Sequence, residues 1–159
     1  MKIVAIDPGY DRIGVAVLER TTTGDCLLFS TCITTDKKQN IPERIFYLGT
    51  ALEKILQDYS PSALALETLF FNKNIKTGIG VAEARGAILF LAQKYGCTVY
   101  EFSPQQIKVA TTGYGKSDKS AVISMVKILL PNVPTTALDD EYDAIATGIT
   151  CLAHNRQNR

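Results

Sequence analysis

Two short apolar runs in this chain each end in an acidic residue, and this pattern constrains the fold more than any other feature of the sequence. Residues 2–6 (KIVAI) lead directly into Asp7, and a Pro-Gly pair follows. Proline lacks the N–H that a central strand needs and glycine permits a tight turn, so a strand must end at Asp7. Residues 62–66 (SALAL) lead in the same way into Glu67, without the polar alternation of a half-exposed strand. Such a run is typical of a strand buried on both faces.

Acidic residues at these strand ends are expected to come together in space. Ligands of open α/β sheets collect outside the carboxyl ends of parallel strands, so we expect Asp7 and Glu67 to be neighbours. Asp140 and Asp143 are spaced i, i+3 and therefore share one face of a helix. Taken singly, each acid is more often a turn or helix-capping residue. Their joint order along the chain favours a single cluster of four carboxylates.

A cluster of carboxylate oxygens is typical of a site for a hard cation. Mg²⁺ takes one or two carboxylates and completes its shell with water and substrate phosphate oxygens. Without a cation, the clustered charges would repel one another. Two such ions can activate water and stabilise the departing oxyanion of a phosphodiester, which requires no histidine or cysteine nucleophile. The chain has a single histidine, His154, so the pattern predicts a metal-dependent nuclease.

The remaining periodicity predicts an α/β fold in which a mixed sheet carries helices on both faces. Strands are predicted over residues 2–7, 12–20, 26–34, 62–67 and 97–101. Helices are predicted from about residue 42, over 74–95, and near 103–111, 118–130 and 138–154, with Ser117 or Asp118 as an N-cap. The length suits one domain over residues 1–154, followed by a polar tail, 155–159.

Six segments of the chain together resemble the RuvC family of Holliday-junction resolvases. They are residues 5–9 with Gly14, 66–67, 70–74, 83–86, 118–120 and 140–146. The resemblance covers almost the whole chain and implies a ribonuclease H-like fold with a five-stranded sheet in the order 3-2-1-4-5. It also implies that Asp7, Glu67, Asp140 and Asp143 are the catalytic, metal-binding acids.

Two positions depart from the family pattern or blur it. Asp139 directly precedes Asp140, and the i, i+3 relation to Asp143 favours Asp140 as the metal ligand. Thr68 stands where the family has an amide side chain after the catalytic glutamate.

The resemblance implies a crossover junction endodeoxyribonuclease that nicks opposing strands of four-way DNA and leaves 5′-phosphate and 3′-hydroxyl ends. Its cofactor would be Mg²⁺, two ions per active site, with Mn²⁺ able to substitute. Lys119 would complete the catalytic set by stabilising charge near the scissile phosphate. The resemblance further implies a branch-migration motor as a partner complex.

Aromatic and basic residues near these acids are candidates for binding DNA. Phe70 is assigned by resemblance to stacking on an unpaired base, whereas Phe71 is expected in the core. An isolated lysine is more often only a solvated surface residue. The full set is Phe70, Lys73, Lys76, Arg85, Lys108, Lys116 and Lys119.

The predicted helix over residues 74–95 has an unusually small-sided surface, formed by Gly78, Gly80, Ala82, Ala84, Gly86 and Ala87. Glycine inside a helix costs roughly 1 kcal/mol relative to alanine, so a close approach is expected to compensate. That approach is either packing on the chain's own sheet or a homodimer interface. The resemblance implies the dimer, with Ile79, Ala82 and Gly86 at the interface.

Composition is compatible with these predictions but does not generate them. The net charge is only +1, so any DNA-binding surface must be a local patch. The four cysteines show no C-x-x-C spacing and are expected to be reduced and mostly buried, as in a cytoplasmic protein. No signal peptide is expected, and the longest apolar stretch, 87–92, is far below the ~20 residues that span a bilayer.

Three other functions compete with junction cleavage. An RNA-processing nuclease would keep the ribonuclease H-like fold and change the substrate. A sugar kinase or actin-like ATPase shares the glycine hairpin after Asp7 but needs two duplicated domains. A non-catalytic junction-binding module is disfavoured because all four acids are present.

Overall fold

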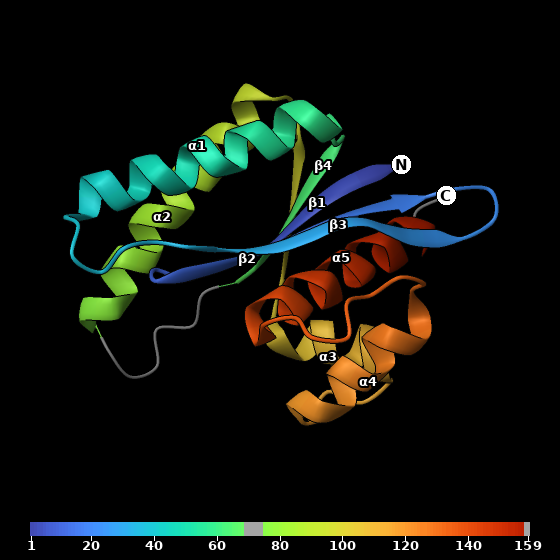
Figure 1. The fold of residues 1–159 in the computed structure, drawn as a ribbon. Coiled ribbons are helices and arrows are strands. Elements are labelled where there is room, and N and C mark those ends of the chain that lie inside the picture. Colours follow the sequence, from blue (N-terminus) through green and yellow to red (C-terminus); the bar gives the residue numbers. More distant parts are fainter. Residues whose placement is uncertain (69–74, 158–159) are drawn as a thin grey trace.

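The structure, a computed structural model, describes residues 1–68 and 75–157 and contains a five-stranded sheet between two layers of helices (Figure 1). The strands are β1 (Lys2–Asp7), β2 (Arg12–Arg20), β3 (Asp25–Thr34), β4 (Ala63–Glu67) and β5 (Thr98–Phe102). The helices are α1 (Ile41–Tyr59), α2 (Ile75–Lys94), α3 (Pro104–Thr112), α4 (Lys119–Leu129) and α5 (Asp139–Gln157). None of the described helices is long and apolar enough to cross a membrane.

The sheet has the order β3-β2-β1-β4-β5, which confirms the predicted ribonuclease H-like topology. β1 runs antiparallel to β2 and parallel to β4, and β4 runs parallel to β5. In the parallel pair, Ile6 lies opposite Leu66. The next residue of each strand is acidic, so Asp7 and Glu67 leave the same edge of the sheet on adjacent strands.

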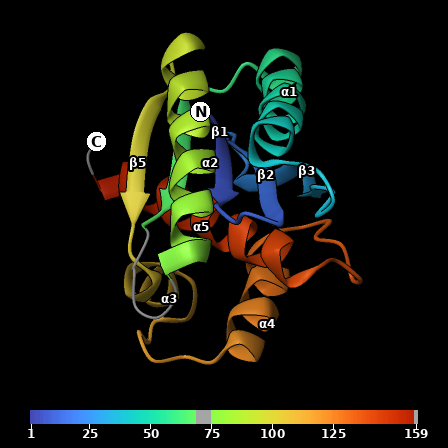
Figure 2. The same cartoon turned by 90° about the vertical axis from the view of Figure 1, so that its left-hand side faces the viewer.

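Alternate side chains of the central strands supply two separate cores. Val4, Ile6 and Leu64 pack under α1 and α2 on one face of the sheet. Ile3 and Ala5 pack under α3, α4 and α5 on the other face. Figure 2 shows α1 and α2 side by side in front of the sheet, with α5 behind it. Because both faces are covered, the central strands are almost entirely apolar up to their acidic ends.

Side-chain caps fix where several helices begin. Asn40 and Glu43 form a reciprocal capping box at the start of α1. Asp118 accepts a hydrogen bond from the backbone N–H of Ala121 and is therefore the N-cap of α4, one of the two predicted candidates. A capped α4 sets the position of Lys119, its first residue.

Helix α5 extends further than predicted, to Gln157 instead of residue 154. Asn155 accounts for part of this extension. Its side-chain amide donates to the carbonyl of Cys151, and its side-chain oxygen accepts from the Tyr100 hydroxyl. Part of the predicted polar tail is therefore helical and tied to β5.

The first turn of α5 lies directly on β2 at Gly14. A Cβ atom at Gly14 would stand 1.8 Å from the backbone oxygen of Asp140, which no packing allows. Gly14 also pairs with Asp7 in the β1–β2 ladder. The absence of a side chain at this one position brings the start of α5 next to the end of β1.

We expect Gly14→Ala to lower the free energy of unfolding by about 1–3 kcal/mol, because α5 or β2 must move to admit the methyl group. Urea denaturation measures this change. Gly49→Ala is the matched control, since a Cβ at Gly49 in α1 would meet nothing within 4 Å. The control should be neutral or stabilising by up to about 1 kcal/mol. Equal stability of Gly14→Ala and the wild type would contradict the close approach.

Candidate active site

Four carboxylates from three elements form one electrostatic cluster at the carboxyl edge of the sheet. Asp7 ends β1, Glu67 ends β4, and Asp140 and Asp143 lie at the start of α5. Burial raises the pKa of Asp7 to about 7, and the charges of Glu67, Asp143 and Asp140 add to this effect. Burial and the charge of Asp143 also raise the pKa of Glu67. The other three acids are therefore close enough to Asp7 to oppose its ionisation, and Asp143 is close enough to Glu67 to do the same.

The structure distinguishes Asp140 from its neighbour Asp139. One carboxylate oxygen of Asp140, Oδ2, is buried and accepts no hydrogen bond from the described residues. Arg12 Nε lies 3.3 Å from this oxygen, so the two form an ion pair without hydrogen-bond geometry. The side chain of Asp139 is 65% exposed and contacts Lys119 at 3.4 Å. Asp140 is thus the member of the pair that has a buried oxygen without a hydrogen bond.

Lys119 and Lys108 are the cations beside Glu67 and Asp143. Lys119 Nζ donates to Asp143 Oδ2 at 2.9 Å. Burial by itself lowers the pKa of Lys119, but the hydrogen bond to Asp143 and the charge of Asp139 outweigh it and raise the pKa above its ordinary value. Both lysines line a cavity of about 240 Å³ together with Glu67 and Asp143. This cavity, which we call the lysine cavity, offers positive charge directly beside the carboxylates.

The donor set fits a hard divalent cation that shares its coordination with water and substrate. Its ligands are all carboxylate oxygens, one of which is buried and lacks a hydrogen bond. Among the described residues, no three His, Cys, Asp or Glu side chains are grouped tightly enough to enclose an ion by themselves. This spacing agrees with the raised pKa values of Asp7 and Glu67, because a neighbouring charge acts over longer distances than metal coordination does. An open set of ligands is what Mg²⁺ uses when phosphate oxygens complete its shell.

Arg85, a predicted DNA-binding residue, is engaged within the protein. Its guanidinium contacts Glu101 Oε1 at 2.6 Å and donates to the backbone oxygen of Glu67 at 3.4 Å. Thr68 makes a second link between these strands, since its hydroxyl donates to the backbone oxygen of Phe102. Both contacts hold the end of β4, and with it Glu67, against β5.

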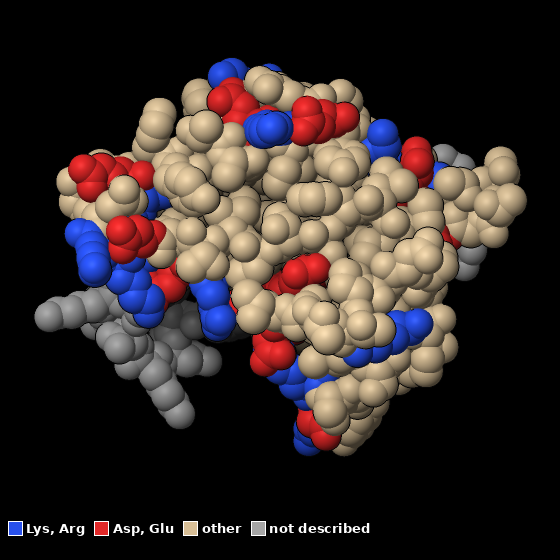
Figure 3. Space-filling model, in the orientation of Figure 1, with Lys and Arg blue, Asp and Glu red and all other residues tan. Residues whose placement is uncertain are grey.

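The other predicted DNA-binding residues divide between described and undescribed positions. Lys108 is half-buried in the lysine cavity, and Lys116 is exposed on the turn between α3 and α4. Phe70 and Lys73 lie outside the described residues, as does Phe71, and so does the side chain of Lys76. Figure 3 shows acidic side chains at the lower centre of one face, with lysine and arginine side chains on both sides of them.

Arg12 is the residue of this site that sequence reasoning missed. It opens β2, directly after the hairpin turn that follows Asp7, and forms the ion pair with Asp140. The signal available in the sequence was a basic residue directly after that turn. Its partner could not be predicted because Asp140 lies more than a hundred residues along the chain.

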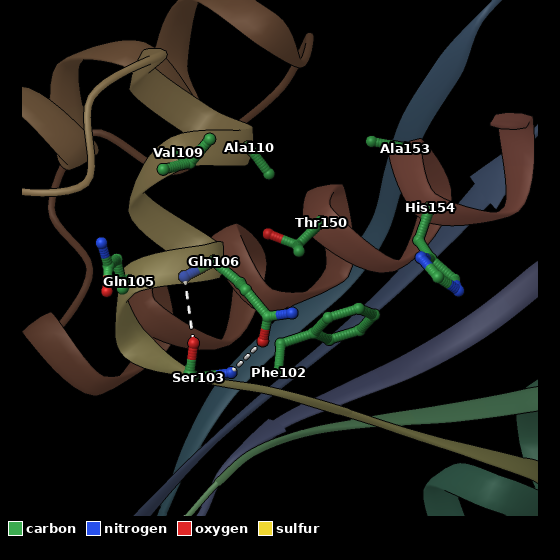
Figure 4. A pocket seen from close by; sticks show the side chains of 9 residues that line it. All are labelled: Phe102, Ser103, Gln105, Gln106, Val109, Ala110, Thr150, Ala153 and His154. Atoms are coloured by element: carbon green, nitrogen blue, oxygen red, sulfur yellow. Dashed lines mark hydrogen bonds between the residues drawn. The ribbon is translucent and has the colours of Figure 1, made fainter.

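A larger cavity, of about 590 Å³, lies away from the acids between α3 and the end of α5 (Figure 4). Its lining includes Gln106, Thr150 and His154 and contains no carboxylate. The Gln106 side chain completes the capping box of α3 with Ser103. This cavity therefore lacks the chemistry of the acid cluster.

The raised pKa of Asp7 predicts how the stability of the metal-free protein depends on pH. A carboxyl whose folded pKa is about 7, against an ordinary 3.8, stabilises the fold fully below about pH 4. This contribution is lost as the pH rises through about 7. In EDTA at pH 8, Asp7→Asn should therefore be more stable than the wild type, by at most about 4 kcal/mol. The advantage should disappear towards pH 4.

Thermal unfolding of both proteins across this pH range measures the difference. Asp58→Asn, at an exposed position of α1, is the control and should change the melting temperature little. A metal-free Asp7→Asn protein that is less stable than the wild type at pH 8 would refute the raised pKa of Asp7.

Comparison with known proteins identifies the family. The sequence model for crossover junction endodeoxyribonuclease RuvC matches residues 3–151. RuvC of Thermosipho melanesiensis is 44% identical over 153 residues, covering 96% of this chain and 97% of that protein. RuvC of Petrotoga mobilis is 41% identical over 147 residues, covering 92% and 90%.

Solved structures agree with the sequence comparison. A structure of Thermus thermophilus RuvC superimposes with a TM-score of 0.89 at 28% identity, covering 99% of this chain and 97% of that chain. The same protein in complex with a Holliday junction substrate gives a TM-score of 0.92 at 28% identity, covering 99% and 96%. The fold and the near full-length sequence match agree, and the chain belongs to the RuvC family of crossover junction endodeoxyribonucleases.

Proposed function

We propose that this protein is a divalent-metal-dependent endonuclease that resolves four-way DNA junctions by paired, symmetric nicks. The observation that carries the proposal is the coupled cluster of Asp7, Glu67, Asp140 and Asp143, with Lys119 bonded to Asp143. Its relatives are named crossover junction endodeoxyribonucleases, and the Thermus relative has been solved with a Holliday junction substrate. These names support junction DNA over structured RNA as the substrate.

The four acids would hold Mg²⁺, two ions per site, with Mn²⁺ as a substitute. When bound, such ions activate water for attack on phosphorus and stabilise the departing oxyanion. Asp7 and Glu67 supply the two ligands fixed by the sheet, and Asp140 and Asp143 supply those fixed by α5. A carboxylate that already has a raised pKa, as Asp7 does, gains most from a neighbouring cation.

Lys119 acts on the phosphate. Its raised pKa keeps the ammonium charged, and its hydrogen bond to Asp143 aims it at the acid cluster. From there it stabilises charge that develops on the scissile phosphate. Lys108 lies in the same cavity and positions the adjoining backbone. Cleavage leaves 5′-phosphate and 3′-hydroxyl ends.

Further contacts are proposed to the DNA strand where it leaves the lysine cavity. Lys116, on the turn after α3, contacts the backbone, and Lys73 and Lys76 do so near α2. Phe70 stacks on an unpaired base at the junction, worth about 1–3 kcal/mol. Arg85 acts through Glu67, whose backbone oxygen it contacts.

The protein acts as a homodimer through the outer face of α2. Ile79 and Phe90 are 55% and 68% exposed, and Ala82 and Gly86 lie exposed between them, which gives an apolar stripe interrupted by the exposed Glu83. A Cβ at Gly86 would meet nothing within 4 Å. Gly80 differs, because a Cβ there would lie 2.6 Å from the Tyr10 ring. Close packing within the chain therefore accounts for Gly80, and a partner subunit is proposed to account for Gly86.

A two-fold enzyme matches a two-fold junction, since two symmetric active sites can cut opposing strands. The chain works as a single nuclease domain, residues 1–154, in the cytoplasm. A branch-migration motor is proposed as a further partner complex.

Strand cleavage of a mobile four-way junction tests the activity. We expect paired nicks in Mg²⁺, none in EDTA, and a loss of at least about 100-fold for Asp7→Asn, because even residues that only orient metal ligands are worth 10–100-fold. Linear duplex is the substrate control, and Asp58→Asn is the protein control. Cleavage of structured RNA in preference to the junction would assign the RNA-processing alternative. Tight junction binding without metal-dependent nicks would assign the non-catalytic module.

The dimer proposal predicts that Ala82→Arg and Gly86→Glu yield folded monomers that have lost paired nicking, because each buries a charge in the apolar stripe. Sedimentation and the ratio of paired to single nicks measure the two effects. Gly49→Glu adds the same charge to an open position of α1 and should leave both unchanged. A dimeric, fully active Gly86→Glu protein would remove α2 from the interface.

A further inference from the structure

A second cavity borders the acid cluster at Asp140, separate from the lysine cavity that borders Glu67 and Asp143. Its volume is about 500 Å³, and its lining includes Arg12, Thr34, Lys37 and Asp140. We call it the arginine cavity. The acids thus lie between two cavities, each of which carries basic side chains. A nucleic-acid strand whose scissile phosphate sits on the acids must continue past both ends of the cluster.

Arg12 is the cation best placed to bind a ligand in the arginine cavity. Its side chain is 49% exposed, and Asp140 is its only polar partner among the described residues. The contact involves Nε at 3.3 Å and lacks hydrogen-bond geometry. A guanidinium carries five N–H donors in a planar fork that matches phosphate oxygens. Those of Arg12 are therefore available to a ligand.

A rigid network forms the wall behind Arg12. Arg44 is buried and donates to Asp11 Oδ1 at 2.6 Å, to Thr35 Oγ1 at 2.7 Å and to the backbone oxygen of Tyr10 at 3.1 Å. Its guanidinium also lies 3.8 Å from the centre of the Tyr10 ring. These contacts hold the turn that precedes Arg12. The start of β2 is therefore fixed, and the cavity is preformed.

The charges of this region favour an anion. Lys37 Nζ lies 2.7 Å from Asp11 Oδ2, and Arg44 holds the other oxygen of Asp11, so two cations neutralise one carboxylate. Arg12 faces Asp140, the only other acid that lines the cavity among the described residues. Any cation held by Asp140 would compete with Arg12 for that carboxylate and leave the guanidinium without its partner.

We propose that the arginine cavity binds a backbone phosphate of the DNA strand being cut, on the side of the scissile phosphate away from Lys108 and Lys119. Arg12 is its principal ligand, and Lys37 adds charge at the rim. When a metal ion occupies the acid cluster, Arg12 releases Asp140 and binds this phosphate instead. The assignment rests on the proposed junction-cleaving function and extends it to a second phosphate site.

The test measures junction affinity in Ca²⁺ in place of Mg²⁺, with the DNA checked to be uncut. Arg12→Ala should weaken binding about tenfold or more, because it removes hydrogen bonds to a charged group. The slope of log affinity against log salt should fall by about 1, as expected for one lost phosphate contact. Arg12→Lys should keep the slope and recover only part of the affinity, since it keeps the charge and loses the fork.

Lys38→Ala is the matched control. Lys38 is an exposed lysine next to Lys37 in the chain, but it does not line the cavity. Its removal should change the affinity by no more than about twofold and leave the slope unchanged, since an isolated exposed charge contributes little. Melting temperatures of all variants show that each protein is folded.

Junctions with single methylphosphonate linkages locate the phosphate. Neutralising one particular linkage should weaken the wild type as much as Arg12→Ala does, and should weaken Arg12→Ala itself little, because the two changes remove the same contact. No such linkage, or an unchanged affinity and slope in Arg12→Ala, would overturn the proposal and leave Arg12 as a counterion of Asp140 only. Arg12-dependent stabilisation by inorganic phosphate, without an effect on junction binding, would reassign the cavity to a free anion. If the wild type bound no junction at all, the proposed function itself would fail.

Discussion

The backbone of the first turn of α5 lies against β2 at Gly14, and the arrangement of the whole site depends on this contact. Gly14 is opposite Asp7 in the ladder, and its missing side chain admits the Asp140 carbonyl. Further along α5, Gly148 makes a similar approach to Leu18. The same packing that covers one face of the sheet therefore brings the acids of α5 to the end of β1.

This arrangement concentrates negative charge where burial already disfavours it. The pKa of Asp7, about 7, records both effects, burial first and then the neighbouring carboxylates. Lys119 and Arg12 offset part of the repulsion through their ion pairs with Asp143 and Asp140. The protein can hold the acids together because the two strands and the helix that carry them are packed into the cores and cannot relax outward. Such packing preorganises the carboxylates.

Much of this protein could be predicted from the sequence because the signals are local. The acidic ends of β1 and β4 follow from their Pro-Gly and apolar neighbours, and α4 begins after Asp118, one of the two predicted N-caps. Whether Asp139 or Asp140 faces the cluster was harder to predict from the sequence. Adjacent residues point in different directions around the helix axis, and only the packing of α5 fixes its rotation about that axis. The Gly14 contact supplies that fixed reference.

The sequence by itself determined the strands, the approximate extents of the helices, the acids Asp7, Glu67 and Asp143, and the family, because each depends on short-range patterning or on motifs along the chain. Only the tertiary structure decided which side chains contact one another. Arg12 with Asp140, Arg85 with Glu101, and Gly80 against Tyr10 join residues that are distant along the chain. Such pairs depend on how the helices pack on the sheet. Local sequence propensities carry no information about contacts between residues far apart in the chain.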